Sequence, residues 1–247
     1  MSEGKRQLDG QVVVVTGASR GIGASTARLL AERGANLVLG ARSAAELLAL
    51  SESIGGEVAY RPADVTRPED VQALVNLAVN RFGRLDVFIA NAGVAVNAPL
   101  AAGDFDDWNR MIDVNLRGVL HSVAAAVPVF RQQGSGHFVT VTSTAAQKWV
   151  PGQGVYAATK AAVRALCEVL RQELAPEHVR ATMICPGFTD TDFIGSTRDP
   201  QELAALTARR NEMAMPPQAV AEAVFYALSQ PETVDVGEII VRPTVQP

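Results

Sequence analysis

The sequence predicts one α/β domain, a doubly wound parallel sheet of about seven strands with helices on both faces. Short β-branched runs recur along the chain, and stretches with helical spacing separate most of them. The runs are apolar throughout, which is typical of strands buried on both faces of a parallel sheet. A length of 247 residues fits a single domain of this class. The expected strands are residues 12–16, 36–40, 57–60, 85–90, 137–142, 180–185 and 238–241.

The segments between these strands follow in chain order. A glycine-rich turn and a helix running to Arg33 come after the first strand. The clearest helix covers residues 104–133, where apolar side chains recur at helical spacing, Asp104 is a candidate N-cap and Gly134 a stop signal. Residues 188–217 show no such pattern. About thirty residues is long for a connection in a compact domain, so this segment is a candidate substrate lid.

Composition excludes several classes of function. The chain is 48% hydrophobic and 19% charged, its net charge is −4, and no run of like charges occurs in the sequence. The charge pattern therefore does not favour binding to nucleic acid or to an anionic membrane surface. The first ten residues lack an apolar signal segment and the longest apolar runs are too short to span a bilayer, so we expect a cytoplasmic protein.

Cysteine and histidine placement gives no indication of a metal or redox centre. Cys167 and Cys185 lie in strongly periodic segments and show no CxxC spacing, so we expect reduced cysteines that pack in the core. His121, His137 and His178 are scattered along the chain, and no metal site is expected.

The turn after the first strand is the first candidate ligand site, because ligands of open α/β sheets bind beyond the carboxyl ends of the strands. Residues 16–23 read TGASRGIG, with glycines at positions 17, 21 and 23. Glycine lets the backbone approach a pyrophosphate closely, and the N-terminus of the next helix offers free N–H groups and a positive dipole end. A merely tight strand-to-helix turn is the alternative explanation.

This turn resembles the cofactor loop of the classical short-chain dehydrogenase/reductase family, and later motifs fall in that family's order over nearly the whole chain. The resemblance implies a Rossmann-like fold and a nicotinamide cofactor. Residues 64–65 resemble the family's adenine-contacting pair, and residues 91–93 resemble its NNAG motif, in which Ala90 replaces the first asparagine. The cofactor residues implied here are Gly17, Ser19, Arg20, Gly21, Ile22, Gly23, Asp64, Val65, Asn91, Ala92 and Gly93.

Ser143, Tyr156 and Lys160 form the strongest signal in the chain. Tyr156 and Lys160 are four residues apart on an expected helix and therefore share a face. Ser143 lies 13 residues before Tyr156, the spacing that the family uses, and Asn115 matches the fourth member of the family's catalytic tetrad. Each residue alone has an ordinary explanation, as packing, surface charge or a helix cap. Together with the glycine loop they indicate catalysis.

Residues 186–191 resemble the family's PG motif with its downstream threonine. An ordinary Pro-Gly turn is the alternative explanation of the motif taken alone. The resemblance implies that this segment contacts the nicotinamide carboxamide. The matching cofactor residues are Pro186, Gly187, Thr189 and Thr191.

The end of the second strand favours NADP(H) over NAD(H). A ribose 2′-hydroxyl is usually met by an acidic side chain at this point, but the chain has no Asp or Glu there before Glu46. Arg42 stands in that position, and Arg20 can reach the same group from the glycine loop. Two guanidinium groups suit a 2′-phosphate in charge and in geometry. A solvated arginine just before a helix is the alternative.

By resemblance, Tyr156 is the general acid and base of hydride transfer between the cofactor and a small carbonyl or alcohol substrate. Ser143 then holds the substrate oxygen, Lys160 also binds the nicotinamide ribose, and Asn115 positions a water that relays protons. Lys160 and an oxidised nicotinamide ring both favour tyrosinate. We therefore expect the pKa of Tyr156 to fall toward neutrality.

The substrate and the assembly are less sharply predicted. Residues 237–244 and the turn at residues 189–191 resemble a branch that includes clavulanic acid dehydrogenase and bacterial 3-hydroxy acid dehydrogenases, which implies a polar or carboxylate-bearing aldehyde or hydroxy acid. The side chains expected to wall the pocket are Val94, Val96, Gln147, Lys148, Trp149, Val150, Phe188, Phe193 and Ile194.

Small residues on the helix from about residue 155 permit close helix contacts, and the family forms dimers or tetramers through it, although the same alanines can pack on the sheet. Two other functions fit the same fold. One is a nucleotide-sensing regulator without catalysis. The other is a dehydratase or epimerase that uses the same tyrosine.

Overall fold

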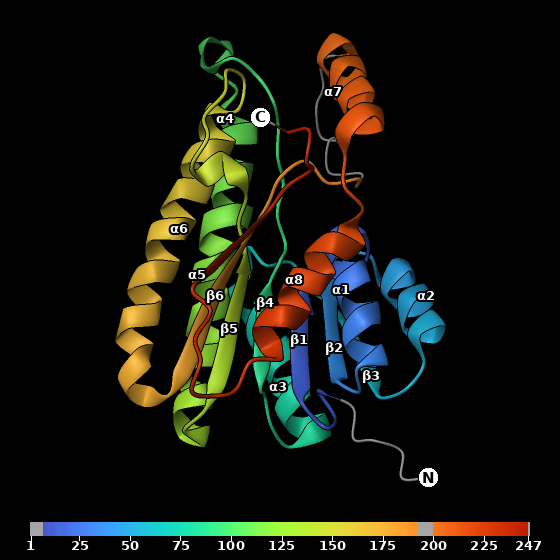
Figure 1. Cartoon of the computed structure of the whole chain (residues 1–247), viewed down its shortest axis with the longest axis vertical. Helices are drawn as coiled ribbons and strands as arrows, with labels where there is room; N and C mark the ends of the chain where they lie inside the picture. Colours follow the sequence, from blue (N-terminus) through green and yellow to red (C-terminus); the bar gives the residue numbers. More distant parts are fainter. Residues whose placement is uncertain (1–6, 192–199, 247) are drawn as a thin grey trace.

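The computed structural model describes residues 7–191 and 200–246, and seven parallel strands in these ranges form one sheet (Figure 1). Their spatial order is β3-β2-β1-β4-β5-β6-β7. This architecture confirms the predicted fold class, and the strand limits differ from the predicted ones by no more than two residues. The strands are β1 (Val12–Thr16), β2 (Asn36–Ala41), β3 (Val58–Pro62), β4 (Val87–Ala90), β5 (Gly136–Val141), β6 (Val179–Pro186) and β7 (Glu238–Val241).

Helices cover both faces of the sheet. On one face lie α1 (Gly21–Glu32), α2 (Ala44–Ile54) and α8 (Pro217–Leu228); on the other lie α3 (Pro68–Phe82), α5 (Gly118–Gln133) and α6 (Gly154–Leu174). The remaining helical segments are η1 (Leu100–Ala102), α4 (Phe105–Ile112), η2 (Asp113–Arg117), η3 (Thr144–Ala146), η4 (Ala175–Glu177) and α7 (Pro200–Met213). Within the described ranges, no helix combines the length and the apolar character needed to cross a bilayer.

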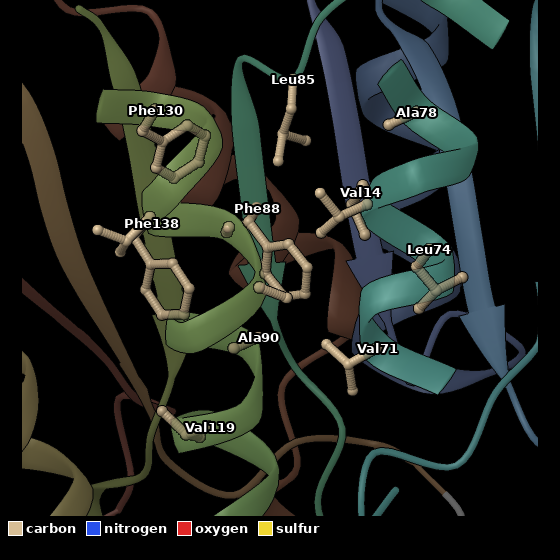
Figure 2. Packing of buried hydrophobic residues seen from close by; sticks show 14 of the residues in the cluster. Val14, Val71, Leu74, Ala78, Leu85, Phe88, Ala90, Val119, Phe130 and Phe138 are labelled. Carbon is tan, nitrogen blue, oxygen red and sulfur yellow. The ribbon is translucent and has the colours of Figure 1, made fainter. Parts of the chain in front are cut away.

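The valine run of β1 shows why a central strand of this sheet is apolar throughout. Val12 and Val14 pack into the cluster under α3 and α5, while Val13 and Val15 pack into the cluster under α1 and α8. Successive strand side chains point to opposite faces, so one run supplies both cores. Figure 2 shows the first cluster, in which the stacked rings of Phe88 and Phe138 have centroids 5.6 Å apart.

The helix predicted over residues 104–133 is present in three consecutive segments, α4, η2 and α5. Asp104 is its N-cap, as predicted, because its carboxylate accepts from the Asp107 N–H at 3.1 Å. Gly134 ends it in the left-handed region with a φ of +69°. The difference is the π-helical η2, whose wider turn changes the direction of nearby side chains and is often found at functional sites. Asn115 lies within this turn.

The segment 188–217 is less irregular than predicted. It contains α7, a largely polar helix whose weak apolar pattern did not mark it in the sequence. The two ends of the segment are joined, because the Met215 N–H donates to Phe188 O at 3.0 Å and the Asp190 N–H donates to Met215 O at 2.8 Å. Phe193 and Ile194, both predicted pocket residues, lie outside the described residues.

Candidate active site

The predicted site residues gather at the carboxyl edge of the sheet. The chain runs outward from β1 through β2 to β3 and then crosses to β4 on the other side of β1. The carboxyl ends of β1 and β4 therefore flank the switch point, which is where ligands bind in open α/β sheets. The glycine turn follows β1, and the segment 91–93 follows β4.

Asn91 fixes the glycine turn to the neighbouring strand end. Its Nδ2 donates to Thr16 O at 2.9 Å and to Gly17 O at 3.1 Å. The Thr16 hydroxyl in turn accepts from the backbone N–H groups of Asn91 at 3.1 Å and Ala92 at 3.3 Å. A Cβ on Gly23 would lie 2.3 Å from Gly17 O, which no side chain tolerates. The turn is thus closed by a long-range contact between the two loops.

The start of α1 carries uncapped backbone donors. Arg20 occupies the N-cap position in extended geometry, with no side-chain cap and no acidic residue in the first helical turn. The first N–H groups of a helix have no partner inside the helix, and the helix dipole adds positive potential there. Gly21 opens the helix with a φ of +55°, and Ser19 and Ile22 beside it are half-buried. This donor set fits a pyrophosphate.

Two exposed cations border this helix end. Arg20 and Arg42 are both exposed, and neither guanidinium group forms a hydrogen bond or ion pair with the part of the chain that the structure describes. Arg42 follows the end of β2 directly, and Ser43 after it caps α2 by accepting from the Glu46 N–H at 3.3 Å. Both guanidinium groups are therefore free to pair with a bound anion.

The Asp64–Val65 pair lies in the turn that follows β3. The Asp64 carboxylate is already engaged, accepting from the Thr66 N–H at 2.9 Å and from the Thr66 hydroxyl at 2.8 Å. Val65 packs against α5, because a Cβ on Gly118 would lie 2.8 Å from its Cγ2. The turn is therefore held in place by the Asp64 carboxylate and by α5.

Asn115 joins the loop after β4 to α6. Its Oδ1 accepts from the Val94 N–H and its Nδ2 donates to Val94 O, both at 2.8 Å. Nδ2 also donates to the Thr159 hydroxyl at 3.2 Å, and the side chain is 1% exposed. Both amide donors are thus used within the protein, and one Oδ1 lone pair remains. The sequence did not predict the contacts to Val94 and Thr159.

Ser143, Tyr156 and Lys160 meet at the end of β5. Ser143 follows the strand and caps η3 by accepting from the Ala145 N–H at 3.1 Å. Its side chain is also hydrogen-bonded to Tyr156. Lys160 Nζ donates to Val141 O at 3.1 Å and lies 5.9 Å from the Tyr156 ring centroid. Tyr156 is 8% exposed and Lys160 5% exposed, so the cluster is preformed and buried.

Burial moves the pKa of Tyr156 away from neutrality, whereas the predicted fall toward neutrality depends on Lys160 and the charge of an oxidised nicotinamide ring together. Burial raises the pKa of Tyr156 to about 12, and the hydrogen bond with Ser143 acts in the lowering direction. Burial also lowers the pKa of Lys160 to about 8. Desolvation disfavours the charged form of each group. Lys160 alone therefore does not bring Tyr156 into the neutral range.

The PG turn lies between the C-terminal residues and the glycine turn. The Gly187 N–H donates to Val241 O at 2.7 Å, and Gln246 Oε1 accepts from the Phe188 N–H at 2.8 Å. A Cβ on Gly187 would lie 2.3 Å from that oxygen. Further along, Thr189 Oγ1 donates to Gly187 O at 3.0 Å, and a Cβ on Gly21 would lie 3.0 Å from the Thr191 methyl group. No sequence motif predicted the contact of Gln246 with this turn.

The described residues of the predicted pocket wall fall into three groups. Val94 and Val96 pack in one apolar cluster with the Tyr156 ring. The segment 147–150 is exposed, and the Gln147 carboxamide donates to Glu238 at 2.7 Å, so it is held by β7. Phe188 is half-buried in the PG turn.

No group of three or more His, Cys, Asp or Glu side chains in the described ranges is placed to hold a metal ion. Cys167 and Cys185 are both free and buried, as predicted. A cavity of about 550 Å³ lies at the opposite edge of the sheet, at the amino ends of β2 and β3, and its lining includes Arg28, Glu32 and Ser53. None of the predicted site residues lines it.

Comparison with known proteins supports the resemblance that the sequence motifs indicate. Residues 11–202 match the family model described as short chain dehydrogenase. The chain is 42% identical over 245 residues to an uncharacterized oxidoreductase of Listeria monocytogenes, covering 97% of this chain and 99% of the relative. It is also 39% identical over 246 residues to glycine betaine reductase of Emericella nidulans, covering 98% of this chain but 19% of that protein.

Solved structures agree with this match. An alcohol dehydrogenase from Thermococcus sibiricus, complexed with 5-hydroxy-NADP, superposes with a TM-score of 0.85 at 36% identity and covers 96% of this chain and 98% of its own. A short-chain dehydrogenase/reductase from Burkholderia phymatum, in complex with NAD, has a TM-score of 0.88 at 28% identity and covers 95% and 89%. The structural neighbours thus bind nicotinamide dinucleotides of both kinds.

Proposed function

The chain belongs to the short-chain dehydrogenase family of oxidoreductases, and from this premise we propose that it transfers hydride between NADP(H) and a small carbonyl or alcohol substrate. One observation carries the proposal. Asn115 comes from η2, Ser143 from the turn after β5, and Tyr156 and Lys160 from α6, and hydrogen bonds and ring contacts bring them to one edge of the sheet. A polar or carboxylate-bearing aldehyde or hydroxy acid is the first substrate class to test.

The chain's donors suggest how the dinucleotide is held. The N-terminus of α1 and the glycine turn would bind the pyrophosphate, residues 64–65 would lie beside the adenine, and residues 186–191 would contact the nicotinamide. Arg20 and Arg42 would hold a ribose 2′-phosphate, since both guanidinium groups lack a partner within the described residues. When bound, the dinucleotide supplies or accepts the hydride.

The proton chemistry falls to the chain's own side chains. In the reductive direction the Tyr156 hydroxyl would donate its proton to the substrate oxygen, while the Ser143 hydroxyl orients that oxygen. The pKa of Tyr156, about 12, has to fall before the phenol transfers its proton efficiently near neutral pH. The adjacent Lys160 ammonium would favour the tyrosinate, and a positive group bound beside the ring would add to this effect. Asn115 has one lone pair available to position a relay water.

Cofactor binding is the experiment that tests this function. The protein would be titrated with NADPH and, separately, with NADH at fixed ionic strength, and nicotinamide fluorescence would report binding. We expect NADPH to bind at least about tenfold more tightly, which is about 1.4 kcal/mol. Equal affinities would remove the arginine pair from the proposal. Failure to bind either dinucleotide would contradict the oxidoreductase function itself.

We also propose that the chain assembles as a homodimer or tetramer through α5 and α6. Leu120 on α5 and Leu166 and Val169 on α6 are exposed apolar side chains. Ala158 and Ala165 are exposed on α6, so a second helix can approach closely there. Sedimentation equilibrium would test this proposal, and a monomer at micromolar concentration would contradict it.

A further inference from the structure

The carboxylate of Glu238, the first residue of β7, collects donors from three other elements. Gln147 Nε2 donates to Oε1 at 2.7 Å, and the Cys185 thiol donates to the same oxygen at 3.1 Å. Arg164 binds in a forked arrangement, with Nε 3.0 Å from Oε1 and Nη2 2.9 Å from Oε2. The Glu238 side chain is 22% exposed. Forked pairs of this kind fix orientation as well as distance.

Each donor adjoins a different part of the proposed catalytic site. Gln147 lies in the segment between Ser143 and Tyr156. Arg164 is four residues beyond Lys160 on α6, which places the two on the same helix face. Cys185 directly precedes the PG turn, and its Sγ lies 2.8 Å from the hydroxyl of Thr142, the residue before Ser143. One carboxylate thus connects the loop after β5, the catalytic helix and the end of β6.

The charges around this carboxylate keep it ionised. The Arg164 guanidinium, which donates two hydrogen bonds, holds the pKa of Glu238 below its usual range. Burial raises the pKa of the Cys185 thiol to about 12, so the thiol keeps its proton and remains a donor. The network is therefore one ion pair with two neutral donors, and its bonds persist across the neutral range.

We propose that Glu238 is a positioning residue for the reaction. It ties residues 144–153 and the first half of α6 to β7, and thereby keeps the Ser143 and Tyr156 hydroxyl groups in register for one substrate oxygen. Small displacements of such groups have large effects on rate, of about a hundredfold for roughly 1 Å. The inference rests on the proposed function for its kinetic part only.

Glu168 provides a matched control within the same helix. Its carboxylate accepts from Arg171 Nε at 3.0 Å and Nη2 at 2.8 Å, and from Gln172 Nε2 at 2.8 Å. A forked arginine and a glutamine amide bind both carboxylates, and Glu238 has the Cys185 thiol as a further donor. Both donors belong to α6 itself, so this carboxylate joins no separate elements. Removal of the Glu168 carboxylate changes the surface charge by the same amount as removal of the Glu238 carboxylate, but it does not free residues 144–153.

Hydrogen exchange of the protein without cofactor tests the inference independently of activity. In Glu238→Gln we expect the amides of residues 144–153 to exchange roughly tenfold faster than in the parent, with the core strands unchanged. Glu168→Gln should leave them at the parent rate. Gln147→Ala removes the loop's bond alone and should raise exchange in the same residues, which keeps the test available if Glu238→Gln folds poorly. Unchanged exchange in both Glu238→Gln and Gln147→Ala would overturn the inference.

Steady-state kinetics with NADPH then separates positioning from general damage. For Glu238→Gln we expect kcat to fall roughly 10- to 100-fold, while the Kd for NADPH changes by less than about threefold. Equal losses in Glu238→Gln and Glu168→Gln, or a Kd that rises as much as kcat falls, would contradict a positioning role. If the parent chain turns over no carbonyl substrate, the proposed function fails, and the exchange experiment still decides the inference.

Discussion

The two ends of the candidate site are built differently. At the catalytic end, Asn115, Tyr156 and Lys160 are buried, and hydrogen bonds to other parts of the protein hold Asn115 and Lys160 in place. At the dinucleotide end, Arg20 and Arg42 are exposed without partners among the described residues, and the first turn of α1 has no capping side chain. The catalytic end is therefore preformed, whereas the dinucleotide end leaves its donors available for a ligand.

This difference predicts how strongly each end responds to substitution. In a preformed cluster a single substitution should have a large effect on activity or stability, because loss of one group leaves the others misaligned or unpaired. Open cations act through charge in a solvated setting, where single contacts contribute less. Substitutions at each end of the site test this contrast.

Removal of the Tyr156 hydroxyl should have the largest effect. In Tyr156→Phe the ring that packs with Val96 and Ala157 is kept, but the proton donor is lost. We expect turnover to fall by roughly 10³-fold or more, with NADPH binding within about threefold of the parent. Single-turnover kinetics and fluorescence titration would measure the two quantities. Near-normal turnover on the true substrate would mean that another group is the acid.

Asn115 tests whether the catalytic end depends on its partnered polar groups. In Asn115→Leu the Val94 N–H and C=O lose their partners in a buried setting, so we expect the free energy of unfolding to fall by about 2–4 kcal/mol. Thr159→Val removes one weaker bond from the same group and should cost about 1 kcal/mol. Urea denaturation would measure both. If Asn115→Leu were as stable as the parent, the hydrogen bonds between Asn115 and Val94 would not stabilise the catalytic end.

Substitution at the dinucleotide end should have a more moderate effect, and it should change the affinity for NADPH only. In Arg42→Ala we expect NADPH to bind about tenfold more weakly, while NADH affinity stays unchanged, because only NADPH carries the 2′-phosphate. Arg28→Ala is the matched control. That arginine is also exposed on the surface but donates to Ser53 at the opposite edge of the sheet. Equal losses for NADPH and NADH in Arg42→Ala would indicate a general electrostatic effect.

The two ends also differ in how much of them the sequence predicts. The glycine turn, the cap at Asp104 and the Tyr156–Lys160 pair are local patterns, readable within a few residues. The valine run of β1 is also a local pattern, because a strand buried on both faces must be apolar throughout. These patterns predict the fold class.

The remaining contacts join residues that are far apart in the chain. Glu238 binds Gln147 across 91 positions and Cys185 across 53, and Asn115 binds Val94 across 21. No local periodicity encodes such pairs. The π-helical turn at Asn115 was missed for the same reason, since it depends on the packing of the folded protein.

The smallest expected effect concerns His137, a buried group at the amino end of β5, away from the site. Burial lowers its pKa from 6.5 to about 3, and Nε2 lies 2.7 Å from the Thr182 hydroxyl. The unfolded chain binds a proton below about pH 6.5 while the folded protein resists it, so the contribution to stability is full above that pH and is lost as the pH falls toward 3. His137→Asn should flatten the decline in unfolding free energy between these values, by at most about 1.4 kcal/mol per pH unit.

Urea denaturation of the parent and of His137→Asn at several pH values would give the two slopes. If His137→Asn kept the parent's slope, the buried ring would already be protonated or hydrated in the folded state. Burial in this sheet would then not by itself displace pKa values, and the raised pKa of Tyr156 would need a cause specific to the catalytic end.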